Sequence, residues 1–127
     1  MTPNETLELA DRFFNALMAG DTATVASLYA TDAAVWHNFS KVDQARDANL
    51  ATLGWVTRHV SGLSYDEIRR NVIPDGFVQQ HVLRGTAPDG TALEVPAMMR
   101  VYCSDGHITR IEEYLDTAQT KALMARG

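Results

Sequence analysis

Cysteine, positive charge and long hydrophobic runs are all scarce in this sequence. Cys103 is the single cysteine among 127 residues, which excludes an internal disulfide and is typical of a reducing compartment. The 11 lysines and arginines are outnumbered by 16 aspartates and glutamates, so the net charge is −5 and no basic stripe could follow a phosphate backbone. We therefore expect no nucleic-acid partner.

Membrane and cofactor signals are missing as well. No apolar run approaches the roughly 20 residues that a membrane-spanning helix needs, and the polar start Met1–Glu5 lacks the apolar centre of a signal peptide. There is no glycine-rich phosphate loop and no nucleophile elbow, and the 4 histidines lack the spacing of a zinc site. We expect a cytoplasmic protein with no membrane partner, no metal and no cofactor.

The composition is that of an ordinary globular protein. Hydrophobic residues make up 46% of the chain and charged residues 21%. A chain of this length can bury a core without disulfides, so residues 1–127 are expected to form one domain.

Capping signals predict two helices at the start of the chain. Thr2, Pro3 and Glu5 form a capping box with proline at the first helical position. Apolar residues then recur every three or four positions until Gly20, which suits a left-handed helix end. Asp21 can cap a second, shorter helix.

The rest of the chain changes from helical to strand periodicity. Ala33–Phe39 is predicted to be a strand, and Asp43–His59 a third helix with Ala48, Leu53 and Val56 facing inward. Turns containing Asp-Gly then separate four predicted strands of an antiparallel meander. These strands are Ser64–Ile73, Phe77–Thr86, Thr91–Tyr102 and His107–Asp116, and a short helix over Thr117–Arg126 follows. Helices followed by a meander predict an α+β fold.

Two segments resemble a known superfamily. Arg12–Asp21, continued by Leu28–Val35, is similar to the opening of nuclear-transport-factor-2-like proteins, which include the SnoaL-like, ketosteroid-isomerase-like and limonene-epoxide-hydrolase-like families. Asp105–Asp116 is similar to their final strand. The resemblance covers nearly the whole chain and implies a cystatin-like α+β cone, in which a curved antiparallel sheet wraps around the N-terminal helices and one apolar pocket. These motifs specify function weakly, because the superfamily contains isomerases, cyclases, dehydratases, epoxide hydrolases and non-enzymes.

The catalytic sets of these relatives are only partly present. Matching the motifs places Phe13 and Met98 at the two oxyanion-hole donors of ketosteroid isomerase, and His37 at its base. Phenylalanine and methionine cannot donate a hydrogen bond, so steroid isomerisation by that mechanism is not expected, and Met98 also replaces the acid of the SnoaL-type cyclases. In the pattern of the limonene-epoxide-hydrolase-like proteins, His81 occupies the position of an arginine on a middle strand. Glu113 occupies that of the acid on the last strand, and His37 that of an asparagine on the first strand.

Three residues are the candidate catalytic groups. His37 shares a strand face with Val35 and could act as a general base near pH 7. The alternative is a histidine at the edge of the core that is bonded to a backbone carbonyl or to a neighbouring side chain. Glu113 lies between apolar neighbours, where burial would raise its pKa, unless it is solvated or pairs with Arg100. His81 faces the same cavity if the 77/79/81/83 face of its strand points inward, and the other face is nearly as apolar.

Apolar residues at these spacings could line a ligand pocket or simply fill the core. The candidate substrate-binding residues are Phe13, Phe14, Leu17, Val35, Trp55, Met98, Arg100 and Leu115. Trp36 and Tyr102 are expected on the outer face of the sheet, where they favour a homodimer, as the resemblance also implies.

The sequence leaves three functions open. The first is a cofactor-free enzyme that acts on a small, largely apolar molecule by general acid/base catalysis or water activation, as an isomerase, hydratase or epoxide hydrolase would, through His37, Glu113 and His81. The second is a non-catalytic small-molecule-binding or accessory dimeric domain. The third is a structural protein whose dimer surface matters more than its interior.

Overall fold

The first helix begins and ends at its predicted capping residues. In the computed structural model, which describes residues 1–121, α1 spans Pro3–Ala19. The Glu5 backbone N–H donates to Thr2 Oγ1 at 3.1 Å, and the Thr2 N–H donates to Glu5 Oε1 at 2.7 Å. Gly20 follows with a φ of 69°, the left-handed conformation that glycine adopts without strain. The predicted capping box and left-handed stop are both confirmed.

The next segments differ in part from prediction. Helix α2 (Thr22–Leu28) is capped by Asp21 as expected, but β1 (Tyr29–His37) begins directly after it rather than at Ala33. Residues 43–45 form a short strand, β2 (Asp43–Ala45), that pairs with β1, so α3 starts only at Arg46 and ends at His59. The prediction that Ala48 faces inward is wrong, because Ala48 is exposed and Asn49 is buried instead.

The predicted four-strand meander is confirmed. It consists of β3 (Ser61–Ile73), β4 (Gly76–Thr86), β5 (Ala92–Ser104) and β6 (His107–Leu115), each paired antiparallel with the next. The predicted C-terminal helix appears as a 3-10 turn, η1 (Thr117–Thr120), and its remainder from residue 122 onward lies outside the described residues.

The curved sheet contains the predicted antiparallel meander and adds one parallel pair of strands, so it is mixed. Its order is β2-β1-β6-β5-β4-β3, and β1 runs parallel to β6 while every other pair is antiparallel. In the chain, β2, α3 and the strands β3 to β5 lie between β1 and β6, which is the long connection that a parallel pair needs. β6 therefore pairs with β1 on one side and with β5 of the meander on the other.

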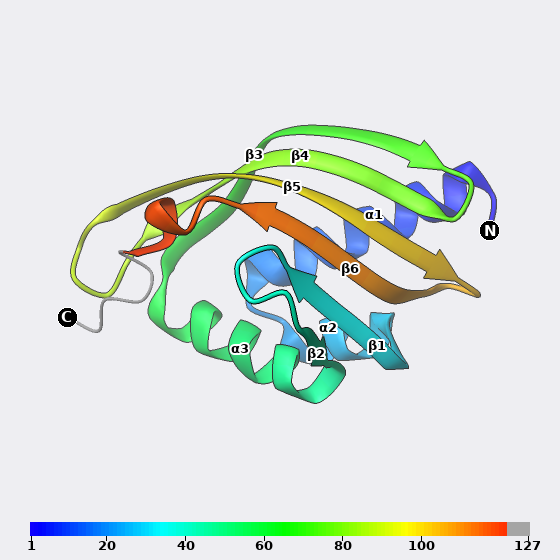
Figure 1. The fold of residues 1–127 in the computed structure, drawn as a ribbon, viewed down its shortest axis with the longest axis horizontal. Coiled ribbons are helices and arrows are strands. Elements are labelled where there is room, and N and C mark those ends of the chain that lie inside the picture. Colours follow the sequence, from blue (N-terminus) through cyan, green and yellow to red (C-terminus); the bar gives the residue numbers. More distant parts are fainter. Residues whose placement is uncertain (122–127) are drawn as a thin grey trace.

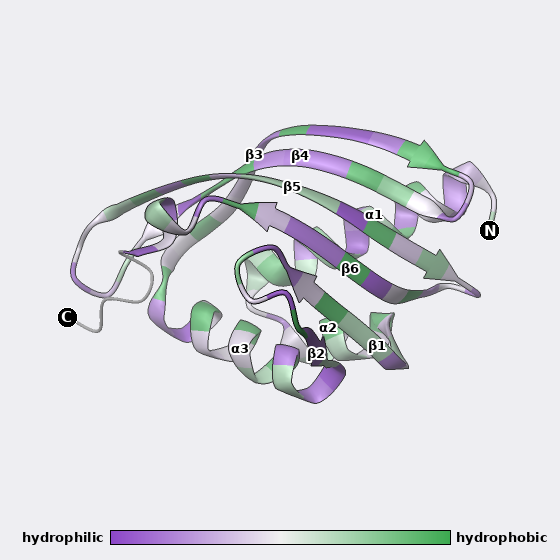
Figure 2. Ribbon diagram, viewed as in Figure 1, coloured by the Kyte–Doolittle hydropathy of each residue, from purple (hydrophilic) through white to green (hydrophobic). Residues whose placement is uncertain are grey.

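The helices lie on one side of the curved sheet and leave the other side uncovered (Figure 1). Figure 2 shows hydrophobic and hydrophilic residues alternating along β5 and β6, as expected for strands with one buried face. The main core joins Phe13 and Phe14 of α1 to Phe77, Val101 and Ile111 of the sheet. No helix within residues 1–121 is long and apolar enough to cross a membrane.

Candidate active site

The parallel pairing of β1 with β6 brings a histidine against a carboxylate. His37 and Glu113 are register partners, and His37 Nε2 lies 3.0 Å from Glu113 Oε1. Their side chains are 21% and 18% exposed. His37 shares the helix-facing side of β1 with the buried Val35. The two residues predicted to act as catalytic groups are therefore in direct contact at the rim of the core.

The same geometry decides between the two alternatives expected for Glu113, which were exposure to solvent and pairing with Arg100. Glu113 is neither fully solvated nor paired with Arg100. Arg100 lies opposite Glu112 across β5 and β6, on the other face of the sheet, and its guanidinium donates to Asp75 at 3.1 Å. The interpretation of Arg100 as a partner of Glu113 is wrong, because adjacent residues of a strand point to opposite faces.

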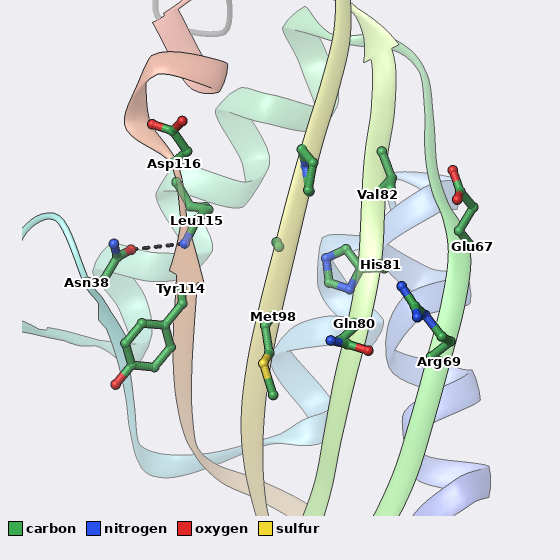
Figure 3. Close-up of a pocket in the computed structure, with 12 residues that line it drawn as sticks. Asn38, Glu67, Arg69, Gln80, His81, Val82, Met98, Tyr114, Leu115 and Asp116 are labelled. Carbon is green, nitrogen blue, oxygen red and sulfur yellow. Dashed lines mark hydrogen bonds between the residues drawn. The ribbon is translucent and has the colours of Figure 1, made fainter.

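Asn38 holds the end of β1 against β6. Its backbone N–H donates to the Glu113 carbonyl at 3.1 Å, and its side-chain oxygen accepts the Leu115 N–H at 3.0 Å (Figure 3). These bonds continue the ladder one residue past His37 and fix the register of the pair. Sequence reasoning missed Asn38, and the only available signal was an amide directly after His37.

The contact with Glu113 determines what His37 can do. A carboxylate only accepts hydrogen bonds, so His37 Nε2 carries the proton in this contact and Nδ1 keeps its lone pair when the ring is neutral. Within residues 1–121 no hydrogen bond is made to His37 Nδ1. The ring of Phe39 lies beside it at 5.1 Å. This arrangement, an imidazole oriented by a carboxylate with one free basic nitrogen, is suited to proton abstraction.

Two tyrosines lie in the electrostatic field of Glu113. Burial, reinforced by the Glu113 charge, raises the pKa of Tyr29 and of Tyr65 above the ordinary tyrosine value, so both hydroxyls stay protonated at neutral pH. The Tyr29 hydroxyl donates to Asn49 Oδ1 at 2.7 Å, and Asn49 in turn donates to Gln44 Oε1 at 3.1 Å. Neither tyrosine was predicted as a site residue.

His81 is buried on the helix-facing side of β4, which settles the face that the sequence left open. It is 3% exposed, and its ring contacts those of Tyr65 and Phe14 with centroids 4.9 and 5.9 Å away. Burial lowers the pKa of His81, the Glu113 charge opposes this effect, and Arg70 adds to it. His81 therefore lies close enough to Glu113 to feel its charge, in a position that favours the neutral imidazole.

The predicted substrate-binding residues are divided between the two faces of the sheet. Met98 is 46% exposed on the outer face, like Arg100, so its predicted position in the interior is wrong. Met99 is the buried methionine and lies opposite Glu113 in the β5–β6 ladder. Met98 and Met99 have the same hydropathy, so the sequence alone does not indicate which of the two faces the core.

The other predicted lining residues lie on the helix side or within α3. Phe13, Phe14, Leu17 and Val35 belong to the buried core, and Leu115 is partly buried. Trp55 is stacked on His59 with ring centroids 4.5 Å apart. That these residues contact a substrate, and that one apolar pocket lies beneath the helices, both stay predictions.

A depression of about 480 Å³ opens on the outer face of the sheet (Figure 3). Its lining includes the exposed side chains of Gln80, Met98 and Tyr114, together with Arg69 and Asn38. Tyr114 packs edge-on against Trp36, which lies on this outer face as expected. His81 and Leu115 line the depression as well, so it also reaches residues that belong to the helix-facing side of the sheet.

The remaining reactive groups do not suggest covalent or metal chemistry. Burial raises the pKa of Cys103 to about 11, so its nucleophilic thiolate is scarce at neutral pH. Across residues 1–121 no three histidine, cysteine, aspartate or glutamate side chains are grouped so that they could hold a metal ion.

The fold and the sequence together define the family. Residues 10–111 match the SnoaL-like domain, so the chain belongs to the SnoaL-like family within the nuclear-transport-factor-2-like superfamily. No curated protein matches the chain.

Solved structures of low sequence identity share this fold. PrhC from Penicillium brasilianum is 14% identical with a TM-score of 0.85, covering 99% of this chain and 89% of PrhC. A proposed polyketide cyclase from Xanthomonas campestris is 18% identical with a TM-score of 0.81, covering 96% and 98%. A protein of ketosteroid isomerase-like fold from Catenulispora acidiphila, solved in complex with trimethylamine, is 14% identical with a TM-score of 0.78, covering 97% and 93%. At these identities the similarity establishes the fold alone.

Proposed function

We propose that this protein is an enzyme that transfers protons on a small, largely apolar molecule, with His37 as the general base and Glu113 as its orienting carboxylate. The observation that carries the proposal is the 3.0 Å contact between His37 Nε2 and Glu113 Oε1 at the edge of an apolar core. A bond of this kind fixes the ring orientation and stabilises the imidazolium that forms when the base takes up a proton.

The proposed step uses the free nitrogen of His37. Nδ1 accepts a proton from a C–H bond or from a water molecule, so that one N–H bond forms as the C–H or O–H bond breaks. The released electron pair moves onto an adjacent oxygen of the substrate or forms the new bond made by the water oxygen. Glu113 stays ionised and balances the positive charge on the ring, and the proton is then returned to the product.

The test is a comparison of three glutamine variants over a panel of enones, hydroxyketones and epoxides. His37→Gln is expected to lower kcat/KM at least about 100-fold, the usual contribution of a general base, and Glu113→Gln is expected to lower kcat by a smaller factor. His107→Gln is the matched control, because His107 is an exposed histidine on β6 whose ring bonds the Asp105 carbonyl, away from Glu113.

Melting temperatures separate chemistry from folding in this comparison. The three variants are expected to melt within a few degrees of the wild type, because all the exchanged side chains reach solvent. Full turnover in His37→Gln would contradict the proposal. Tight binding of panel compounds by the wild type, without turnover of any of them, would favour the alternative of a non-catalytic binding domain.

A further inference from the structure

A row of polar groups crosses the core beside the candidate site. Gln79 and His81 are 1% and 3% exposed on the same face of β4. Arg70 of β3 is the register partner of Gln79, and its side chain is 13% exposed. Its guanidinium lies over the ring of Phe14 at 5.4 Å and bonds Asp11 at 2.8 Å. Buried polar side chains are costly unless they are paired, so this row needs an explanation.

The hydrogen bonds in this row can run in only one direction. Arg70 Nε is a donor, so the Gln79 atom that it contacts at 2.7 Å is the amide oxygen. The Gln79 amide nitrogen, also a donor, therefore faces His81 Nδ1 at 2.9 Å. Nδ1 must accept this bond. The proton of the neutral imidazole is consequently placed on Nε2.

The Nε2–H group of His81 is left free to donate. No hydrogen bond to it is made within residues 1–121. In that part of the chain Arg46 Nε is the one side-chain polar atom that is completely enclosed and unpartnered. His81 Nε2 must therefore reach space that a water molecule can enter, although the residue as a whole is buried.

Tyr65 presents a second free donor next to it. Its ring meets the His81 ring edge-on at 4.9 Å, and its hydroxyl makes no hydrogen bond to the described residues. By the same reasoning the hydroxyl is not enclosed. Both groups lie within the field of Glu113. In the ladder Gln79 pairs with Met99 and Met99 pairs with Glu113, so His81 lies on the same face of the sheet as Glu113, with β5 between them. Two neutral donors on the face that carries the base are suited to hold an oxygen on which negative charge develops.

We infer that His81 binds the acceptor oxygen of the substrate through Nε2–H, and that Gln79 and Arg70 are positioning residues that fix its proton on that nitrogen. The inference rests on the proposed function and narrows its substrate class to apolar molecules that carry a carbonyl oxygen. Tyr65 donates to the same oxygen. His37 removes the proton, and the two donors stabilise the oxygen that receives the electron pair.

The proton position is tested by nitrogen-15 NMR of the histidine side chains at pH 9, where the imidazoles are neutral. In the wild type the His81 proton is expected on Nε2. Gln79→Glu replaces the donor with an acceptor that can still bond Arg70, so the proton is expected to move to Nδ1. Gln80→Glu is the matched control, because the neighbouring Gln80 is exposed on the outer face. A wild-type proton on Nδ1, or one that stays on Nε2 in Gln79→Glu, would overturn the inference.

Ligand recognition is tested with two molecules of the same shape, cyclohexanone and methylenecyclohexane. Cyclohexanone is expected to shift the His81 Nε2–H resonance and to bind roughly tenfold more weakly to Gln79→Glu, the loss of about one hydrogen bond. Methylenecyclohexane has no acceptor, and its binding should not change. Equal losses for both molecules would show that His81 supplies no donor to the ligand.

Two further measurements keep the outcomes distinct. If Gln79→Glu does not fold, Gln79→Met removes the same donor, and the proton is then expected to populate both ring nitrogens. Cyclohexanone binding is also measured in His37→Gln, where it should persist. Loss of turnover in His37→Gln without a cyclohexanone shift at His81 would refute this inference alone, whereas the shift with unchanged turnover would refute the proposed base alone.

Discussion

Tyr29 and Tyr65 have the same hydroxyl group in two different environments. Tyr29 is buried and Tyr65 is half-buried, and the charge of Glu113 acts on both, but the Tyr29 hydroxyl donates to Asn49, whereas that of Tyr65 has no partner among the described residues. A buried hydroxyl contributes to stability only when it is bonded, and an unbonded one is retained at a cost. The unpartnered group is therefore the one that we associate with ligand binding.

Phenylalanine substitutions are expected to separate the two roles. Tyr29→Phe should lower the free energy of unfolding by about 1–2 kcal/mol, because Asn49 loses its partner. Tyr65→Phe should change it by less than about 0.5 kcal/mol and instead reduce turnover. Chemical denaturation and kinetic assays of both variants provide the measurement, and a large loss of stability in Tyr65→Phe would contradict this interpretation.

Tyr29 and Tyr65 also predict how the free energy of unfolding depends on pH. The pKa of each tyrosine is raised in the folded state, so the unfolded chain loses the proton first. This contribution is fully present below the ordinary tyrosine pKa of about 10 and declines as the pH rises further. Denaturation series from pH 8 to 11 should show a decline above about pH 10 that is smaller in each phenylalanine variant.

At the scale of the elements, the β3–β4 turn depends on a close approach between strands. A Cβ atom added to Gly76 would lie 1.8 Å from the Val101 carbonyl oxygen. Gly76→Ala is therefore expected to lower the free energy of unfolding by about 3 kcal/mol. Gly106→Ala is the control: it has a φ of 79° but nothing within 4 Å, so only the backbone cost of about 1–2 kcal/mol applies. Equal losses would contradict the contact.

Local sequence signals predicted the helices and strands better than they predicted the contacts between these elements. The capping box at Thr2 and the Asp-Gly turns work through neighbouring residues, so they are legible in the sequence. Strand β2 and the parallel β1–β6 pair depend on residues far apart in the chain and were not predicted. The same is true of Gln79, a polar residue that is buried because Arg70 bonds it.

The sequence likewise indicated only some of the residues of the candidate site. His37, Glu113 and His81 were identified from their residue types and strand faces, and the structure places all three on the helix side. Asn38 and Tyr65 were missed, because a single amide or tyrosine carries no signal until its partners are known. The misplacement of Met98 has the same origin, since only the pairing of Met99 with Glu113 decides which methionine faces inward.

At the scale of the whole molecule, the outer face of the sheet remains uncovered by helices. Met98 and Tyr114 are 46% and 55% exposed there, and Trp36 lies beside Tyr114. We predict that this face forms a homodimer. The double variant Met98→Lys/Tyr114→Lys should shift the protein to monomer in sedimentation equilibrium, because two cations per copy would be desolvated at the contact. Val42→Lys, at a residue 65% exposed in the loop before β2, should not change the association. A monomeric wild type would contradict the prediction.

The position of the base and the carboxylate at the end of the β1–β6 ladder gives the site a particular vulnerability. Beyond His37 and Glu113, the two strands are joined through the bonds of Asn38. The ends of ladders fray more readily than their centres. A brief opening of these final rungs would part the two side chains while the meander stays intact, so the reactive geometry could be lost and regained many times without the protein ever unfolding.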